Sequence, residues 1–203
     1  MARIKICGLS RPCDIDFVNE ARPDCIGFVF AESRRRVTPE EAAAMRARLD
    51  GSIVPVGVFV NEDIGRIARL YGDGVIAAAQ LHGNESDDYI EKLRAECGIQ
   101  VIKAIRVKSR KDIIGAVDSL ADYILYDSAA GSGERFEWSL VKDTPRAFFL
   151  AGGINEFNIK EALALSPFCV DVSSGAETGG VKDREKIKRL VRLVRENEEG
   201  EIE

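Results

Sequence analysis

The chain is poor in the residues that hold metal ions and in paired cysteines. Its 203 residues include a single histidine, His82, which excludes a multi-histidine metal centre. The five cysteines are scattered and show no Cys-x-x-Cys spacing: Cys7, Cys13, Cys25, Cys97 and Cys169. An odd set of this kind argues against a zinc site or a disulfide framework and is typical of a reducing compartment.

The sequence also lacks an excess of positive charge and a long apolar run. The formal net charge of -5 gives no basic field that would attract nucleic acid or an anionic membrane surface. No apolar run reaches membrane-spanning length, and no hydrophobic signal region precedes the first strand-like segment. We therefore expect a cytoplasmic protein whose partner is a small molecule. An anionic ligand is allowed, because helix N-termini and a few arginines can bind one locally.

Apolar, β-branched runs alternate with amphipathic or charged segments along the chain. The expected strands cover residues 3–7, 25–30, 54–60, 77–82, 101–107, 123–127, 147–151 and 168–173. The expected helices cover residues 12–21, 39–49, 62–71, 86–96, 109–120, 156–165 and 182–196. The sixth crossover looks irregular, with at most a short helix at 136–140.

This alternation predicts an α/β fold with a parallel sheet covered by helices. A count of eight strands favours a closed (β/α)8 TIM barrel over an open, doubly wound sheet. We expect a single domain over residues 1–203, in which the acidic segment 197–203 has little to bury and frays.

Two titratable residues end strand-like runs that are otherwise built for burial. Cys7 ends residues 3–7, and Asp127 ends residues 123–127. In a barrel of parallel strands both side chains emerge at the rim that carries the chemistry. A carboxylate is costly to bury unless it is solvated or paired, which favours a role for Asp127. A buried cysteine is more often a packing residue, so position alone does not decide between a catalytic role and a packing role for Cys7.

Glycine-rich segments follow the last two expected strands. Gly152 and Gly153 come after the seventh, and Ser173, Ser174 and Gly175 come after the eighth. Backbone N–H groups of such loops, together with a helix N-terminus, often bind phosphate in barrels. The glycines of residues 130–133, shortly after Asp127, are equally compatible with a mobile loop over the site and with a surface loop of no role.

Further polar residues lie at or near the same rim. Guanidinium groups of residues 34–36 suit a carboxylate or phosphate, and we expect one of them at most to contact substrate. Asp171 alternates with two valines and is expected in the barrel mouth, while His82 is expected to be a hydrogen-bonded rim residue. We expect Lys5 and Lys103 to be buried lysines that pair with acids, and a role as Schiff-base nucleophile is the less favoured alternative.

Six ordered motifs resemble those of phosphoribosylanthranilate isomerases. They are Lys5-Ile6-Cys7-Gly8-Leu9-Ser10, Gly27-Phe28-Val29-Phe30, Val56-Gly57-Val58-Phe59-Val60-Asn61, Gln80-Leu81-His82-Gly83, Leu150-Ala151-Gly152-Gly153-Ile154-Asn155 and Val170-Asp171-Val172-Ser173-Ser174-Gly175. The series continues to Val181-Lys182-Asp183 and so covers nearly the whole chain. Several motifs in order are far more specific than any one of them.

The resemblance implies a (β/α)8 aldose–ketose isomerase of tryptophan, hence aromatic amino-acid, biosynthesis that needs no metal or redox cofactor. Its general base would be Cys7 and its general acid Asp127. The anthranilate carboxylate would bind Arg35, with Arg34 and Arg36 as neighbouring alternatives. His82 and Asp171 would contact substrate, and the phosphate would bind Gly152, Gly153, Ser173, Ser174 and Gly175. The protein would be a monomer or a homodimer.

Three alternatives stay open at this point. A related isomerase of histidine biosynthesis runs the same rearrangement, but that family has an aspartate where this chain has Cys7. A Schiff-base aldolase would use Lys103, and a silent barrel would bind a phosphorylated ligand without turnover. The chain departs from the family pattern at Ala130, Gly180 and Tyr126, and we expect the bulky Tyr126 to alter the pocket shape.

Overall fold

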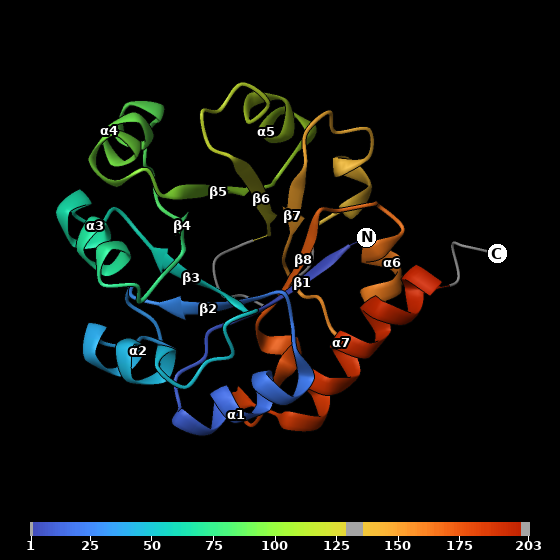
Figure 1. Cartoon of the computed structure of the whole chain (residues 1–203). Helices are drawn as coiled ribbons and strands as arrows, with labels where there is room; N and C mark the ends of the chain where they lie inside the picture. The colour runs from blue at the N-terminus through green and yellow to red at the C-terminus, as the bar shows by residue number, and fades with distance from the viewer. Residues whose placement is uncertain (1, 129–135, 200–203) are drawn as a thin grey trace.

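Eight parallel strands close into a barrel in the computed structural model, which describes residues 2–128 and 136–199. The strands are β1 (Arg3–Cys7), β2 (Cys25–Val29), β3 (Val54–Phe59), β4 (Ala78–Leu81), β5 (Gln100–Arg106), β6 (Tyr123–Asp127), β7 (Phe148–Leu150) and β8 (Cys169–Val172). Each strand pairs with the next, and β8 pairs back with β1. Figure 1 shows the helices arranged outside this ring. The prediction of a (β/α)8 barrel is confirmed.

The helices agree with the predicted segments but differ in length. They are α1 (Pro12–Ala21), α2 (Pro39–Arg46), α3 (Ile64–Gly72), α4 (Asp87–Cys97), α5 (Arg110–Gly115), α6 (Ile159–Leu163) and α7 (Arg184–Glu199). Helix α2 starts at Pro39, the first residue of the expected helix, and Thr38 and Glu41 form a reciprocal capping box there. Helices α5 and α6 have six and five residues, so both are shorter than their apolar patterns predicted.

Strand alternation sorts the barrel residues into two apolar layers. Large side chains such as Ile124 and Tyr126 point outward and pack beneath the helices. Leu125, Phe149, Ala151 and Cys169 belong to the second layer, which fills the inside of the barrel. Because successive residues alternate, Asp127 lies on the inner side with Leu125. The expectation that Tyr126 shapes the pocket is wrong, since its ring packs against Phe148 in the outer layer.

Three local features differ from the predicted pattern. The sixth crossover contains a short 3-10 helix, η1 (Trp138–Val141), close to the short helix allowed at 136–140. A 3-10 turn, η2 (Ser174–Ala176), follows β8 and leads into a small antiparallel hairpin of β9 (Glu177–Thr178) and β10 (Val181–Lys182), which the sequence did not predict. Helix α7 continues through Glu199, past the predicted start of the tail at residue 197.

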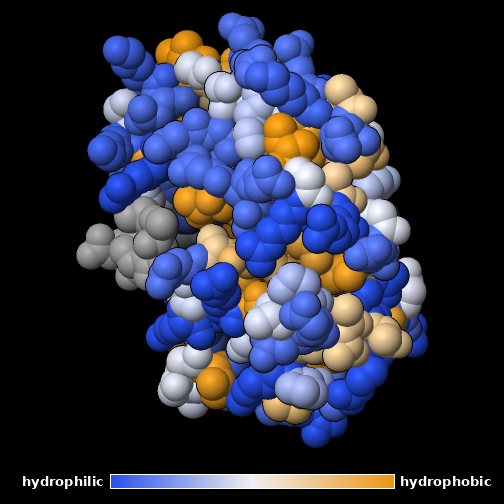
Figure 2. Space-filling model, turned by 90° about the vertical axis from the view of Figure 1, so that its left-hand side faces the viewer, coloured by the Kyte–Doolittle hydropathy of each residue, from blue (hydrophilic) through white to orange (hydrophobic). Residues whose placement is uncertain are grey.

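One side of the molecule is largely polar. Figure 2 shows one side of the molecule, where hydrophilic residues dominate and apolar residues form only small patches. Within residues 2–128 and 136–199, no helix has the length and apolar character needed to cross a membrane. Residues 130–133, for which the sequence allowed either a mobile loop over the site or a surface loop of no role, lie outside the described residues.

Candidate active site

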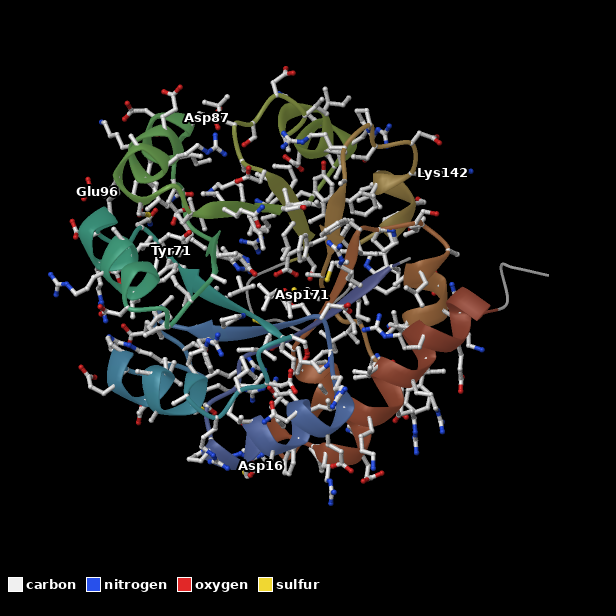
Figure 3. All side chains as sticks on the ribbon, in the orientation of Figure 1. Asp16, Tyr71, Asp87, Glu96, Lys142 and Asp171 are labelled. Atoms are coloured by element: carbon white, nitrogen blue, oxygen red, sulfur yellow. The ribbon has the colours of Figure 1, made fainter. Side chains whose placement is uncertain are left out.

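A cavity of about 420 Å³ opens at the carboxyl ends of the barrel strands. This volume lies in the usual range for small-molecule sites. Most of the predicted site residues line it: Cys7, Arg35, His82, Asp127, Gly152, Gly153, Asp171, Ser173 and Ser174. Figure 3 shows Asp171 near the barrel centre, whereas the other labelled residues lie toward the outside. The fold therefore brings together residues that are up to 167 positions apart, from Cys7 to Ser174.

Cys7 lies at the last position of β1 and is nearly buried, with 8% of its surface exposed. It pairs in register with Gly27 of β2, and a Cβ at Gly27 would lie 2.7 Å from the Cys7 Sγ. Glycine at position 27 thus makes the space that the thiol occupies. Burial raises the pKa of Cys7 above its ordinary value, while the nearby Lys5 and Lys182 lower it in part.

A buried ion pair lies directly beside this thiol. The Lys5 Nζ donates to both carboxylate oxygens of Asp171, at 3.0 and 2.9 Å, and to the Gln80 Oε1 at 2.9 Å. Lys5 is fully buried and Asp171 is 7% exposed. Burial alone would lower the pKa of Lys5, but the Asp171 charge and Cys7 raise it above its ordinary value. A Schiff-base nucleophile needs the opposite shift, so Lys5 is a charged partner and no such nucleophile.

Gln80 connects this ion pair to the carboxyl end of β6. Its Oε1 accepts from Lys5, which leaves its Nε2 as the donor toward the His82 Nδ1, 3.3 Å away. The His82 Nδ1 is then an acceptor, so the neutral ring carries its proton on Nε2. That Nε2 lies 3.5 Å from the Asp127 Oδ2. The prediction that His82 is a hydrogen-bonded rim residue is confirmed.

Asp127 ends β6 and is partly open to the cavity, with 14% of its side chain exposed. Its Oδ1 accepts from the backbone N–H of Ser128 at 2.8 Å. A Cβ at Gly152 would lie 3.1 Å from the same Oδ1, so the loop after β7 passes close to this carboxyl. Cys7 and Asp127 are thus presented to one cavity from two strands that lie apart in the barrel.

Lys103 is held away from the cavity. Its Nζ donates to the Glu85 carboxylate at 2.6 Å and to the Gly83 carbonyl at 2.8 Å. Lys103 does not line the cavity, and its charge is neutralised by an acid that is itself buried. The structure therefore supports the buried ion-paired reading of Lys103 and offers no support for an aldolase.

The loops after β7 and β8 lie against each other. Gly152 and Gly153 have left-handed φ values of 89° and 68°, which favour glycine. Within the described part of the chain, their backbone N–H groups make no hydrogen bond. A Cβ at Gly175 would lie 2.0 Å from the Ile154 carbonyl oxygen, so glycine is needed where the loops touch. Gly175 itself does not line the cavity, unlike the other predicted loop residues.

Of the three adjacent arginines, two line the cavity and they differ in burial. The Arg35 side chain is 14% exposed and donates to Glu177 through Nε at 2.6 Å and Nη2 at 3.0 Å. The Arg34 side chain is 59% exposed and reaches the same carboxylate at 2.9 Å. Arg36 does not line the cavity. Position and burial both favour Arg35 as the substrate-facing member.

Sequence reasoning missed Gln80, which lines the cavity, and also Glu177 and Lys182, which bind residues that line it. Gln80 carried a usable signal, since it is a polar residue inside the apolar strand β4. Lys182 is buried and donates to Glu177 at 2.7 Å and to the Ser173 carbonyl at 3.0 Å. Neither Glu177 nor Lys182 could be recognised from the sequence, because the hairpin that carries them follows no apolar pattern.

The closed barrel and the cavity at its carboxyl-end rim define a (β/α)8-barrel enzyme that acts on a small molecule. The family model of N-(5'phosphoribosyl)anthranilate (PRA) isomerase matches residues 4–193. The N-(5'-phosphoribosyl)anthranilate isomerase of Endomicrobium trichonymphae is 46% identical over 201 residues, which cover 96% of this chain and 99% of that protein. The chain therefore belongs to the phosphoribosylanthranilate isomerase family.

Two solved structures of the family are similar over almost the full length of both chains. One is a monomeric form of the dimeric phosphoribosylantranilate isomerase of Thermotoga maritima, with 35% identity, a TM-score of 0.86 and coverage of 97% of this chain and 100% of that chain. The other is a phosphoribosyl anthranilate isomerase in complex with reduced 1-(o-carboxyphenylamino)-1-deoxyribulose 5-phosphate, with 36% identity, a TM-score of 0.86 and the same coverage.

Proposed function

We propose that this protein converts N-(5'-phosphoribosyl)anthranilate to 1-(2-carboxyphenylamino)-1-deoxyribulose 5-phosphate in tryptophan biosynthesis, with Cys7 as general base and Asp127 as general acid. The reaction is an Amadori rearrangement, which turns an aminoaldose phosphate into a ketose. Membership of the family supports the activity. The presence of Cys7 and Asp127 at two strand ends of one cavity is the observation that carries the assignment of roles.

The first step opens the ribose ring and needs a proton on the ring oxygen. Protonated Asp127 donates this proton, and the C1'–O bond breaks to leave a protonated Schiff base at C1'. The position of Asp127 supports this role, since its carboxyl borders the cavity beside His82 and the Gly152 loop. His82, which presents its Nε2 proton 3.5 Å from the Asp127 Oδ2, stabilises the carboxylate that remains.

The second step removes the proton from C2', which the Schiff base has made acidic. Cys7 accepts this proton as a thiolate, and the electron pair of the C–H bond forms the C1'–C2' double bond of an enolamine. Burial and the Asp171 charge keep the pKa of Cys7 above its ordinary value and Lys5 and Lys182 offset this only in part, so the thiolate that reacts is a minor form of the thiol at neutral pH. Transfer of the C2' hydroxyl proton and protonation of C1' then give the ketone.

The two anionic ends of the substrate have separate binding groups in this proposal. The phosphate accepts hydrogen bonds from the loops of Gly152 and Gly153 and of Ser173 and Ser174, which line the cavity. The anthranilate carboxylate accepts from Arg35, whose guanidinium can give a paired hydrogen bond. Asp171, held by Lys5, contacts the sugar hydroxyls near C2'.

Turnover by purified variants tests the assignment. Substrate is generated in situ, and its consumption is followed by the loss of anthranilate-type fluorescence. Cys7→Ala and Asp127→Asn should each lower kcat by about 10²- to 10⁴-fold, the usual worth of a general acid or base. Both should still bind the reduced product analogue found in the related complex. Cys13→Ala and Asp16→Asn, which change residues outside the cavity, serve as matched controls.

Each outcome has a distinct meaning. Turnover by Cys7→Ala close to that of wild type would reject the thiol as the base. Loss of analogue binding together with turnover would assign Cys7 to binding. A folded wild type without turnover would reject the activity and direct attention to the substrate of the histidine-pathway isomerase or to a binding-only barrel.

We also propose a cytoplasmic enzyme that is a monomer or a homodimer. All five cysteines are free thiols, which fits a reducing compartment. A homodimer has a precedent in the dimeric Thermotoga maritima protein. Light scattering across a range of protein concentrations distinguishes the two oligomeric states.

A further inference from the structure

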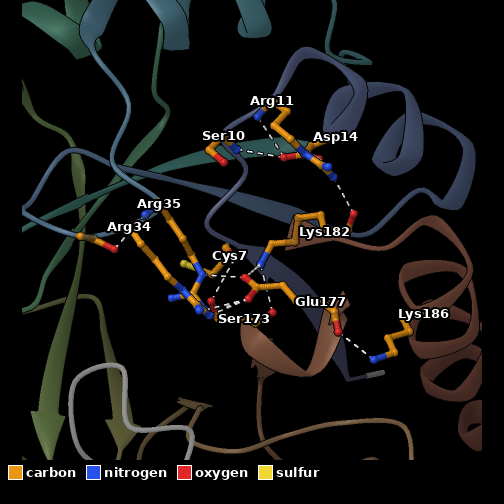
Figure 4. A network of polar contacts seen from close by, with 11 residues as sticks. Cys7, Ser10, Arg11, Asp14, Arg34, Arg35, Ser173, Glu177, Lys182 and Lys186 are labelled. Atoms are coloured by element: carbon orange, nitrogen blue, oxygen red, sulfur yellow. Dashed lines mark hydrogen bonds and ion pairs between the residues drawn. The ribbon is translucent and has the colours of Figure 1, made fainter. Parts of the chain in front are cut away.

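One carboxylate beside the active site is surrounded by three cations. Glu177 of β9 binds Arg35 through both of its oxygens, at 2.6 and 3.0 Å. It also accepts from Arg34 at 2.9 Å and from Lys182 at 2.7 Å. Figure 4 shows these side chains converging on Glu177 close to Cys7. Arg34 and Arg35 come from the loop after β2, so the contact joins segments that are more than 140 residues apart.

The members of this cluster differ sharply in burial. The side chains of Glu177 and Lys182 are 4% and 1% exposed, and that of Arg35 is 14% exposed. Arg34 is exposed by 59% and contacts the cluster from outside. Burial alone would raise the pKa of Glu177, but the hydrogen bonds from Arg35 and Lys182 lower it below its ordinary value. Glu177 is therefore a permanent carboxylate at neutral pH, and a desolvated one.

Arg35 is held along its whole length. Its aliphatic stem lies on Gly8, where a Cβ would be 2.4 Å from the Arg35 Cδ. Gly8 has a left-handed φ of 83° and directly follows Cys7, so the arginine crosses the backbone next to the thiol. At the far end, Nε and Nη2 donate to Glu177. Among the described residues Nη1 donates to none, although Arg35 lines the cavity.

The charge of the cluster is not balanced. Three cations, Arg34, Arg35 and Lys182, face the single carboxylate of Glu177, so the cluster itself has a surplus of two positive charges (three minus one), and its two arginines line the cavity. The chain as a whole carries a net charge of -5, so this surplus is a local feature. An anion that enters the cavity meets a guanidinium whose orientation is already set.

We propose that Glu177 is the positioning residue for recognition of the substrate carboxylate: it holds the Arg35 guanidinium above Cys7 with Nη1 left to donate to that group. The proposal rests on the proposed function. An arginine side chain has many rotamers, and the ion pair with Glu177 removes this freedom before substrate binds. Glu177 touches no reacting atom, and it contributes to affinity and specificity through Arg35.

The test uses the variants Glu177→Gln, Arg35→Met and their combination, with kcat and KM measured on N-(5'-phosphoribosyl)anthranilate. Glu177→Gln should raise KM by about 10- to 100-fold with a smaller change in kcat, the range expected for loss of a charged hydrogen-bonded partner. In the Arg35→Met background it should raise KM by less than about threefold, because residues that act through one another are not additive. Glu20→Gln, which removes an exposed ion-paired carboxylate, is the matched control.

A second substrate separates recognition of the carboxylate from a structural role. N-(5'-phosphoribosyl)aniline, formed from aniline and ribose 5-phosphate, lacks the carboxylate. On this compound, Glu177→Gln should raise KM by less than about threefold. If Glu177→Gln does not fold, Glu177→Asp, which keeps the charge on a shorter stem, replaces it in the same comparison.

Two results would overturn the inference. One is an equal rise in KM on both substrates in Glu177→Gln, which would make Glu177 a structural residue. The other is a rise in KM from Glu177→Gln that is as large in the Arg35→Met background as in wild type. That result would show that Glu177 does not act through Arg35. Failure of the proposed function is distinguishable, since wild type would then turn over neither compound.

Discussion

A methyl group added at Gly27 should disable the enzyme without unfolding it. A Cβ at this position would lie 2.7 Å from the Cys7 Sγ, 3.1 Å from its Cα and 3.3 Å from its Cβ. The Cα belongs to β1, which is paired with β2 at this level, so the backbone has little freedom to move. The thiol must therefore shift or rotate away, and either response moves the proposed base.

The magnitude follows from the size of the clash. Non-bonded heavy atoms prefer separations of about 3.5–4.0 Å, so the sulfur has to move by roughly 1 Å. A misplacement of about 1 Å can cost on the order of 10²-fold in rate. That factor corresponds to roughly 2.7 kcal/mol of activation free energy. The added methyl should also lower the free energy of unfolding by about 1–3 kcal/mol, which a folded domain of this size can tolerate.

The assay compares kcat for Gly27→Ala, wild type and Gly51→Ala. Gly51 is the matched control, because a Cβ there meets nothing within 4 Å. Thermal unfolding monitored by circular dichroism verifies that each variant is folded at the assay temperature. A folded Gly27→Ala enzyme with kcat within about twofold of wild type would refute the reasoning, since 1 Å of displacement would then be harmless.

Three further predictions concern titratable groups. Because burial raises the pKa of Cys7, its labelling by iodoacetamide should reach half of its maximal rate only above pH 9.0, as measured by peptide mass spectrometry. Lys5→Met should lower the free energy of unfolding in urea by about 3–5 kcal/mol, because it leaves the Asp171 carboxylate buried without its cation. Adding Asp171→Asn should recover part of that loss. Burial alone would raise the pKa of Glu85, but its hydrogen bond from Lys103 and backbone donors lower it. The folded protein should therefore lose stability as the pH falls below 4.5, and Glu85→Gln should flatten that part of the profile.

Each of these predictions can fail in a specific way. Half-maximal labelling of Cys7 near neutral pH would mean that the neighbouring lysines outweigh burial. A double variant as unstable as Lys5→Met alone would show that the unpaired carboxylate is not the source of the loss. An unchanged acid profile in Glu85→Gln would indicate that other carboxylates control stability below pH 4.5.

The strands were predictable because their signal is local. Alternating apolar residues identify β6 within five residues, and the same alternation assigns Asp127 to the inner side. The predicted length of helix α5 was wrong. Its apolar pattern extends over residues 109–120, yet the helix ends at Gly115 and Ile114 remains 62% exposed. Local amphipathicity cannot indicate how much of a helix finds a surface to cover.

The sequence by itself determined the eight-strand pattern, the position of Cys7 and Asp127 at strand ends, and the glycines of the two loops. These features depend on short-range spacing and on backbone conformations that individual residues allow. Only the tertiary structure decided that Glu177 holds Arg35, because the two residues meet through a hairpin with no apolar periodicity. It likewise decided that Lys5 pairs with Asp171, since closure of the barrel places β8 beside β1. Ion pairs of this kind arise from contacts between distant segments, and no local pattern encodes the partner.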